Sequence, residues 1–237
     1  MLTAARALGG LVLLKAVDVA LRGPVSGRLW LVGLVLLAAA GAALLAGWDR
    51  GGWVLMVAGA VATAVDAPVE LRRQHLVLLA LVGLAALAAR TPVERRLLWS
   101  VQLSALYGTA AMAKLNEVYL SGTVVAAAVA DAPFGTGVLG VPPLPLAVAA
   151  SLALVAAEVL LAAVPWVPRL HRLGLTVAAA FHLVAVPLAG AEPLVALRLV
   201  VFGGTALVLL AAVTGRLEAE RRAPPSTSGR PARRMHR

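Results

Sequence analysis

Lys114 is the residue of this chain best suited to acid–base chemistry. The 237-residue sequence contains 21 basic residues, and only two of them are lysines. Lys114 directly follows the apolar run from Leu97 to Ala113, which also contains Tyr107. A lysine, unlike an arginine, can lose its proton when it is partly desolvated and can then act as a base. We therefore predict that Lys114 is a catalytic residue.

Polar and small side chains lead up to Lys114 along one face of the same helix. Ser100, Ser104, Tyr107, Ala111 and Lys114 are spaced by four, three, four and three residues, which is the period of a single helical face. The pattern predicts a polar stripe through the membrane, with Ser104 and Tyr107 lining a ligand pocket. The alternative is a packing face whose hydroxyls bond to helical carbonyls, with Lys114 extended to the outer interface.

His75 opens the preceding apolar segment, on the side of the membrane where we expect Lys114. Consecutive antiparallel helices are usually neighbours, so the two residues could meet. A neutral imidazole can accept a hydrogen bond from an amine and hold it in place for base chemistry. We predict that His75 orients Lys114. The alternative is a histidine that is merely hydrated at the interface.

Three further ionisable residues, Glu158, His182 and Arg198, lie inside apolar segments. An unpaired charge there costs ~2.5 kcal/mol or more, so we expect all three to face the bundle interior and line the pocket. Glu158 and His182 could pair, and Arg198 could neutralise Glu192 or an anionic ligand group. A purely structural network is the alternative, because no metal-ligand or nucleophile motif accompanies the three residues.

Composition indicates the environment that holds these residues. The chain is 61% hydrophobic and 14% charged, with a mean hydropathy of +0.93, well above ordinary soluble domains. Apolar runs of about 20 residues recur, the length that crosses a hydrocarbon layer of ~30 Å. The sequence has no cysteine, which excludes disulfides and thiolate metal sites. It predicts an all-α, polytopic transmembrane helix bundle of the cell membrane, with the lipid bilayer as its surroundings.

We expect about eight membrane helices in this bundle. They are placed near residues 3–21, 29–48, 52–67, 74–89, 97–114, 144–164, 173–190 and 194–214. In the first of them, Lys15 and Asp18 are expected to pair on a bundle-facing side. The segment from Ser121 to Pro143 contains an apolar run too short to span, which predicts an interfacial or re-entrant helix after helix five.

Arginine placement predicts the orientation. The loops at residues 90–96 and 165–172 and the tail from Gly215 are rich in arginine, which places both termini in the cytoplasm and Lys114 on the extracytoplasmic side. The loop from Arg22 to Arg28 violates this pattern, so a seven-helix arrangement with an outer N-terminus stays open. Residues 1–214 would form the membrane domain and residues 215–237 a disordered basic cytoplasmic tail that binds lipid and not nucleic acid. The tryptophans at segment ends are expected to be interfacial anchors, namely Trp30, Trp48, Trp53, Trp99 and Trp166.

The run from Gln102 to Gly122 resembles the membrane domain of the vitamin K-dependent gamma-carboxylases and their bacterial relatives, the horizontally transferred transmembrane (HTTM) family. The matching positions in this run are Gln102, Tyr107, Lys114, Leu115, Tyr119 and Gly122. Gln74-His75, Glu158 and Phe181-His182-Leu183 resemble further positions of the family. The resemblance implies that Lys114 is the base that starts oxygenation of a reduced, vitamin K-like quinone and that His75 supports it. This chain departs from the carboxylases in three ways. It has one lysine where they have a Lys-Lys pair, and it has Asn116 where they carry Asp. Tyr119 matches as an aromatic residue but stands where they carry Trp.

The sequence therefore predicts an HTTM-type membrane protein with an outer-facing pocket. Lys114 and His75 would be catalytic, and a quinone or lipid would be the ligand. The pocket would be lined by Tyr107, Ser104, Tyr119, Glu158, His182 and Arg198. We do not expect gamma-glutamyl carboxylation, because the large extracytoplasmic domain that holds the carboxylases' protein substrate is missing. Two alternatives stay open: a non-catalytic bundle that assists a partner redox or thiol-handling enzyme, and a small transporter.

Overall fold

The structure, a computed structural model, describes residues 3–21, 28–66, 72–131, 142–188 and 193–215. Within these ranges the chain is all-helical and contains no strand, as predicted. The long helices are α1 (Ala4–Leu21), α2 (Arg28–Ala46), α3 (Asp49–Asp66), α4 (Arg72–Ala88), α5 (Pro92–Lys114), α8 (Leu144–Ala163), α9 (His171–Leu188) and α10 (Pro193–Val213). The short ones are α6 (Glu117–Leu120), α7 (Thr123–Asp131), η2 (Val164–Trp166) and η3 (Pro168–Leu170).

Among the described residues, three helical stretches are long and apolar enough to cross a membrane. They are Leu29–Ala46, Leu144–Trp166 and Val195–Val213, and a shorter apolar stretch covers His75–Ala88. Many large apolar side chains on the outside of the bundle are exposed, which is the surface that a hydrocarbon surrounding requires. The chain is therefore a membrane protein built of apolar helices.

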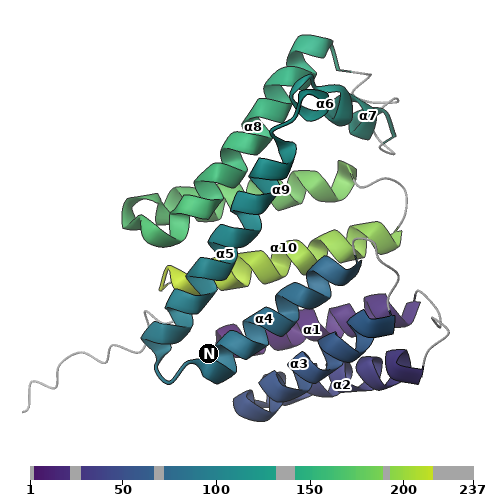
Figure 1. Cartoon of the computed structure of the whole chain (residues 1–237), viewed down its shortest axis with the longest axis vertical. Helices are drawn as coiled ribbons and strands as arrows, with labels where there is room; N and C mark the ends of the chain where they lie inside the picture. The colour runs from purple at the N-terminus through teal and green to yellow at the C-terminus, as the bar shows by residue number, and fades with distance from the viewer. Residues whose placement is uncertain (1–2, 22–27, 67–71, 132–141, 189–192, 216–237) are drawn as a thin grey trace, which may run out of the picture.

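The helices form two groups that share α10 (Figure 1). Helices α1 to α4 pack against their neighbours in chain order, whereas α8 packs against both α5 and α9. α10 contacts α1 on one side and α5 and α9 on the other. Its contact with α1 is close, because a Cβ added at Gly204 would lie 2.7 Å from Leu11 Cδ2. The last long helix thus joins the first group to the second.

α4 and α5 cross near the turn that connects them and then diverge (Figure 1). At the crossing, Trp99 Nε1 donates to the carbonyl of Val82 at 3.2 Å, and Gln102 Nε2 donates to that of Leu81 at 2.8 Å. The C-terminal half of α5 packs instead with α8, so the two ends that carry His75 and Lys114 are separated.

Two of the five tryptophans are core residues and not interfacial anchors. Trp53 and Trp99 are each 3% exposed, and their rings meet edge to face with centroids 6.3 Å apart. The prediction was wrong for these two, because the helix ends that carry them pack against other helices. Trp48 is exposed, in keeping with an anchor.

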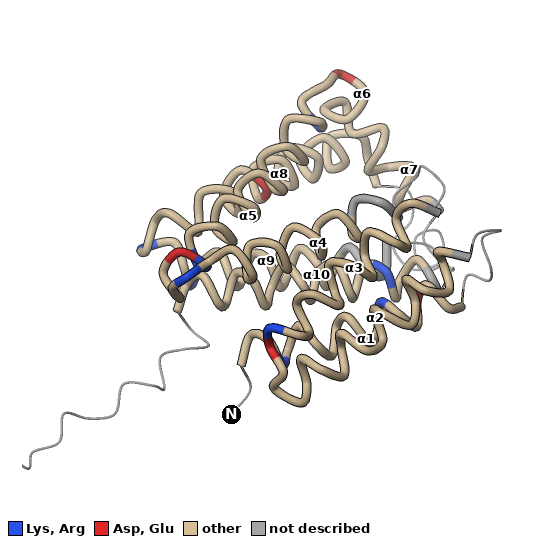
Figure 2. The backbone as a smooth tube through the Cα atoms, turned by 60° about the horizontal axis from the view of Figure 1, so that its bottom comes forward, with Lys and Arg blue, Asp and Glu red and all other residues tan. Residues whose placement is uncertain are grey.

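Charged residues lie mostly near the ends of the helices, with few along their middles (Figure 2). The predicted pairing of Lys15 and Asp18 is confirmed: Nζ and Oδ2 are 2.6 Å apart, and the residues are 1% and 0% exposed. Their pairing lowers the cost of keeping both charges inside the bundle.

The connection after α5 begins with two short helices. Asn116 caps α6 by accepting a hydrogen bond from the backbone N–H of Tyr119 at 3.0 Å. Gly122 has a φ of +80°, and an added Cβ would lie 2.6 Å from the backbone nitrogen of Val148 on α8, so this position requires glycine. α7 has nine residues, too few to cross a membrane. Residues 132–141 and the tail from residue 216 lie outside the described residues, so the disordered tail stays a prediction.

A close helix contact gives a stability prediction. A Cβ added at Gly59 of α3 would lie 2.8 Å from the backbone nitrogen of Leu37 on α2. Gly59→Ala is therefore expected to destabilise the bundle by about 1–3 kcal/mol, as overpacking does. Gly51 of the same helix has nothing within 4 Å, and Gly51→Ala should be neutral or stabilise by up to about 1 kcal/mol. Unfolding in mixed micelles of dodecyl sulfate measures the stability of both variants. An equal loss of stability in Gly59→Ala and Gly51→Ala would contradict the prediction.

Candidate functional site

The polar face of α5 points into the bundle, as its spacing predicts. Ser100, Tyr107 and Ala111 are buried, and Ser104 and Lys114 are partly buried. The last three polar side chains bond to two other helices: Ser104 and Lys114 contact α8, and Tyr107 contacts α9. The stripe is therefore a contact face between α5, α8 and α9.

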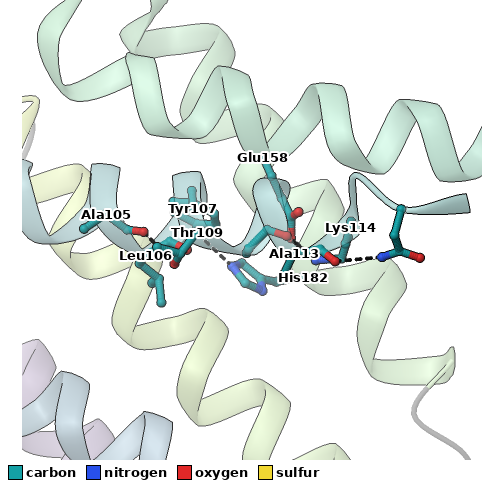
Figure 3. Close-up of polar contacts among 10 residues, drawn as sticks. Ala105, Leu106, Tyr107, Thr109, Ala113, Lys114, Glu158 and His182 are labelled. Carbon is teal, nitrogen blue, oxygen red and sulfur yellow. Dashed lines mark hydrogen bonds and ion pairs between the residues drawn. The ribbon is translucent and has the colours of Figure 1, made fainter. Parts of the chain in front are cut away.

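Lys114 forms an ion pair with Glu158 of α8 (Figure 3). Nζ lies 2.6 Å from Oε1, and it also approaches the carbonyl of Ala110 at 3.5 Å. The side chain therefore turns back along its own helix. The Lys114 side chain is 27% exposed and that of Glu158 is 4% exposed. The pair is open to its surroundings on the lysine side only.

The second carboxylate oxygen of Glu158 does not take part in the ion pair with Lys114. Oε2 is buried and has no hydrogen-bond partner among the described residues. A buried carboxylate oxygen without a donor costs free energy, on the order of 1–3 kcal/mol. The arrangement thus provides an ammonium donor and a carboxylate acceptor side by side.

Tyr119 lies next to Lys114. The lysine Nζ lies 5.7 Å from the centre of the Tyr119 ring, within the range of a cation–π contact. Partial burial, followed by the negative charge of Glu158, raises the pKa of the Tyr119 hydroxyl. The hydroxyl therefore remains a neutral hydrogen-bond donor at physiological pH.

Tyr107 and His182 form a second polar pair on the same face (Figure 3). The Tyr107 hydroxyl and His182 Nε2 are 3.1 Å apart, and the two residues are 3% and 8% exposed. The expected pairing of Glu158 with His182 is therefore wrong, because each has another partner. The His182 ring packs over Gly203 of α10, where an added Cβ would lie 2.6 Å from the ring.

Gly203 gives a prediction for the position of His182. Gly203→Ala is expected to displace the imidazole and destabilise the protein by about 1–3 kcal/mol, because the new methyl group would meet the rigid part of the His182 side chain where the ring joins Cβ. The matched control is Gly204→Ala, whose new methyl group would meet only the flexible end of Leu11. Unfolding of both variants measures the difference. If Gly204→Ala lowers the free energy of unfolding as much as Gly203→Ala does, the prediction is contradicted.

His75 is not brought to Lys114, so that prediction was wrong. The ring of His75 packs edge to face on Phe202 of α10, with centroids 5.4 Å apart. His75 is 2% exposed, and neither ring nitrogen has a hydrogen-bond partner among the described residues. Phe202 also packs on His182, with centroids 6.2 Å apart. α10 therefore stands between His75 and the face that carries Lys114.

Ser104 and Arg198 complete the predicted set. Ser104 donates to the carbonyl of Ala162 and accepts from Trp166 Nε1, both at 2.7 Å, so both of its hydrogen bonds serve helix packing. Arg198 lies in α10, and its Nε has no hydrogen-bond partner among the described residues. Its expected partner Glu192 lies outside these residues, and no described contact joins Arg198 to Lys114.

Two features of this region were missed from the sequence. Ser151 is 0% exposed with an unpartnered hydroxyl, and its seven-residue spacing from Glu158 on α8 could have indicated a shared face. Phe202 packs on both His75 and His182, which lie on different helices, and no local sequence pattern predicts this contact. In the described part of the chain no group of three or more His, Asp or Glu residues could hold a metal ion.

Comparison with known proteins found no match to this chain. No family model, no curated protein and no solved structure matches the chain.

Proposed function

We propose that this chain is an HTTM-like membrane protein whose Lys114–Glu158 pair binds a quinone or lipid ligand and transfers a proton to or from it. The observation that carries the proposal is the half-open ion pair: the lysine is 27% exposed, whereas Glu158 Oε2 is buried without a partner among the described residues. The resemblance of residues 102–122 to the carboxylase membrane domain also supports Lys114 as the residue that transfers the proton.

The pair can act as a base through a proton shift. Lys114 Nζ passes a proton to Glu158 Oε1 across their 2.6 Å hydrogen bond, and the freed amine then takes the proton of a ligand hydroxyl. The ligand oxygen keeps the negative charge that Glu158 held, and the ammonium next to it stabilises that charge. In this scheme His75 has no direct part, and Tyr119 lies beside the reacting nitrogen.

The proposal includes the topology. Eight helices cross the membrane, both termini are cytoplasmic and Lys114 lies on the extracytoplasmic side. The described start of α1 and end of α10 lie at the same end of the bundle in Figure 1, and the close contact of Leu11 with Gly204 agrees with antiparallel packing of these helices. Arginine-rich loops supply the orientation.

The test is binding of a reduced naphthoquinone by the full chain in proteoliposomes, and turnover of that ligand by dissolved dioxygen as the oxidant. Lys114→Ala should abolish both, because the donor and the base are lost. Lys114→Arg keeps the charge but not a base that can be deprotonated, so it should retain ligand binding and lose turnover. Unchanged binding and turnover in Lys114→Ala would overturn the proposal.

The second candidate is a non-catalytic bundle that assists a membrane redox or thiol-handling enzyme. The short Lys114–Glu158 ion pair itself favours it, because such a pair can lock α5 to α8 without chemistry. In that case Lys114→Arg preserves every property of the chain, and no reduced quinone binds to the wild type.

A further inference from the structure

The Lys114–Glu158 pair lies beside the middle of a long apolar helix and not beside its end. The stretch Leu144–Trp166 of α8 is long and apolar enough to cross a membrane, and Val155 is its central residue. Glu158 lies three residues from that centre, about 5 Å along the helix axis, and its Oε1 is 2.6 Å from Lys114 Nζ. Along α8, the pair is therefore about 12 Å from the nearer end of the apolar stretch.

Contacts on both sides of the pair fix this register between α5 and α8. Toward the C-terminal end of α8, Ser104 Oγ donates to the carbonyl of Ala162 at 2.7 Å. Toward its N-terminal end, a Cβ added at Gly122 would lie 2.7 Å from the backbone carbonyl carbon of Ala147. The chain from α5 to Gly122 therefore runs antiparallel to α8, with the ion pair between these two contacts.

α10 gives a second measure of depth. Its apolar stretch Val195–Val213 is centred next to Gly203, which touches the His182 ring, and His182 Nε2 lies 3.1 Å from the Tyr107 hydroxyl. Lys114 is two helical turns beyond Tyr107, about 10 Å along α5. Because α5 runs obliquely to α10 (Figure 1), the difference in depth is smaller than this length. The hydrocarbon layer extends ~15 Å to each side of its centre, so both helices place the pair within it.

The helix end at Lys114 is built for an apolar surrounding. Backbone groups at a helix end need partners wherever water is scarce. Asn116 serves both sides of the break: its Nδ2 donates to the carbonyl of Ala113 at 2.9 Å, and its Oδ1 accepts from the N–H of Tyr119 at 3.0 Å. One side chain thus satisfies the end of α5 and the start of α6.

Large apolar side chains stand next to both members of the pair. Val159 follows Glu158 on α8, and Met112 and Leu115 flank Lys114 in the chain; each of the three is more than half exposed. Exposed apolar side chains of this size are suited to contact with hydrocarbon. The partly exposed lysine therefore opens among side chains that face lipid.

We propose that the Lys114–Glu158 pair lies inside the hydrocarbon layer, near its middle, and opens sideways to the lipid. This inference rests on the proposed function only in taking the pair as the ligand site. The group that meets Lys114 belongs to a molecule dissolved in the bilayer interior, because phospholipid headgroups and water-soluble compounds stay at or beyond the surface. The exposed polar residues Asn116 and Glu117 follow Lys114 and lie between it and the extracytoplasmic surface.

The first test measures depth. The sequence has no cysteine, so single cysteines at exposed positions carry nitroxide labels without background. In proteoliposomes of the full chain, electron paramagnetic resonance compares access of dioxygen, which concentrates in the bilayer interior, with access of a water-soluble nickel chelate. Labels at Val159 and at Val200 of α10 should both show a ratio of dioxygen to nickel access several-fold higher than a label at Leu144. A Val159 label as shallow as the Leu144 label would overturn the proposed depth.

The second test asks from which phase Lys114 is reached. It is one of two lysines, and the other, Lys15, is 1% exposed. In phosphatidylcholine vesicles at alkaline pH, lipid-soluble phenyl isothiocyanate should modify Lys114, as located by mass spectrometry. Its sulfonated, water-soluble analogue, present on both sides of the membrane, should modify it at least tenfold more slowly. Both reagents should modify Lys114 in the unfolded chain, which shows that the amine reacts.

Equal rates for the two reagents in the folded protein would overturn the sideways opening, and so would modification by neither reagent. Lys114→Arg gives the background from the N-terminal amine and Lys15. Both tests are independent of the reduced-naphthoquinone assay. If they give the expected results while that ligand neither binds nor turns over, the proposed function fails and the membrane depth of the pair stands.

Discussion

Replacing Lys15 by methionine is expected to destabilise the folded bundle by about 3–5 kcal/mol, the cost of leaving one member of a buried ion pair without its partner. Asp18 is 0% exposed and accepts from Lys15 Nζ at 2.6 Å. With methionine at position 15, the buried carboxylate loses this ammonium and must stay charged without it or take up a proton. Either outcome costs free energy.

The measurement is equilibrium unfolding in mixed micelles, with two controls. The double variant Lys15→Met/Asp18→Leu removes both charges and should recover most of the loss, because apolar replacement of a buried pair is often neutral or stabilising. Arg6→Met changes an exposed cation of the same helix and should shift the free energy of unfolding by less than about 0.5 kcal/mol. If the double variant is as unstable as Lys15→Met, charge burial is not the cause.

Replacing Lys114 by methionine is expected to destabilise the protein by about 3 kcal/mol, the lower end of the range for buried pairs. The lysine is 27% exposed, so its surroundings compensate part of the loss, but Glu158 is 4% exposed and keeps an uncompensated charge. Adding Glu158→Gln to this variant should restore most of the stability, because a neutral amide needs no counter-charge.

Lys114→Arg separates stability from chemistry at this position. The guanidinium keeps the positive charge opposite Glu158, so unfolding should stay within about 1 kcal/mol of the wild type. Turnover of a reduced naphthoquinone should nevertheless disappear if Lys114 is a base. A large loss of stability in Lys114→Arg would show that the geometry of the amine, and not its charge, holds α5 to α8.

The sequence was sufficient to predict where the long helices lie and which side chains of α1 and α5 face the bundle. Apolar runs placed the long helices to within a few residues, since hydropathy reports the surroundings of each segment directly. Spacing showed that Ser100, Tyr107 and Lys114 share a buried face, and the three-residue step from Lys15 to Asp18 showed their pairing. These are local properties, fixed by the period of a helix.

Partners from distant helices could not be predicted in the same way. We placed His75 beside Lys114 because consecutive helices are usually neighbours, but α4 and α5 diverge and α10 packs between the two residues. Glu158 lies well inside α8, and it reaches Lys114 because the lysine side chain turns back along α5. The burial of Trp53 and Trp99 likewise depends on which helix ends pack together. Such contacts require the three-dimensional arrangement.

The position of α10 also sets an order of events during synthesis. The ribosome completes α1 to α5, α8 and α9 before it completes α10, yet α10 packs against α1, α5 and α9. Until then His75 and His182 lack the Phe202 ring that packs on both. The early helices therefore keep these polar side chains uncovered until the final helix packs against them and completes the bundle.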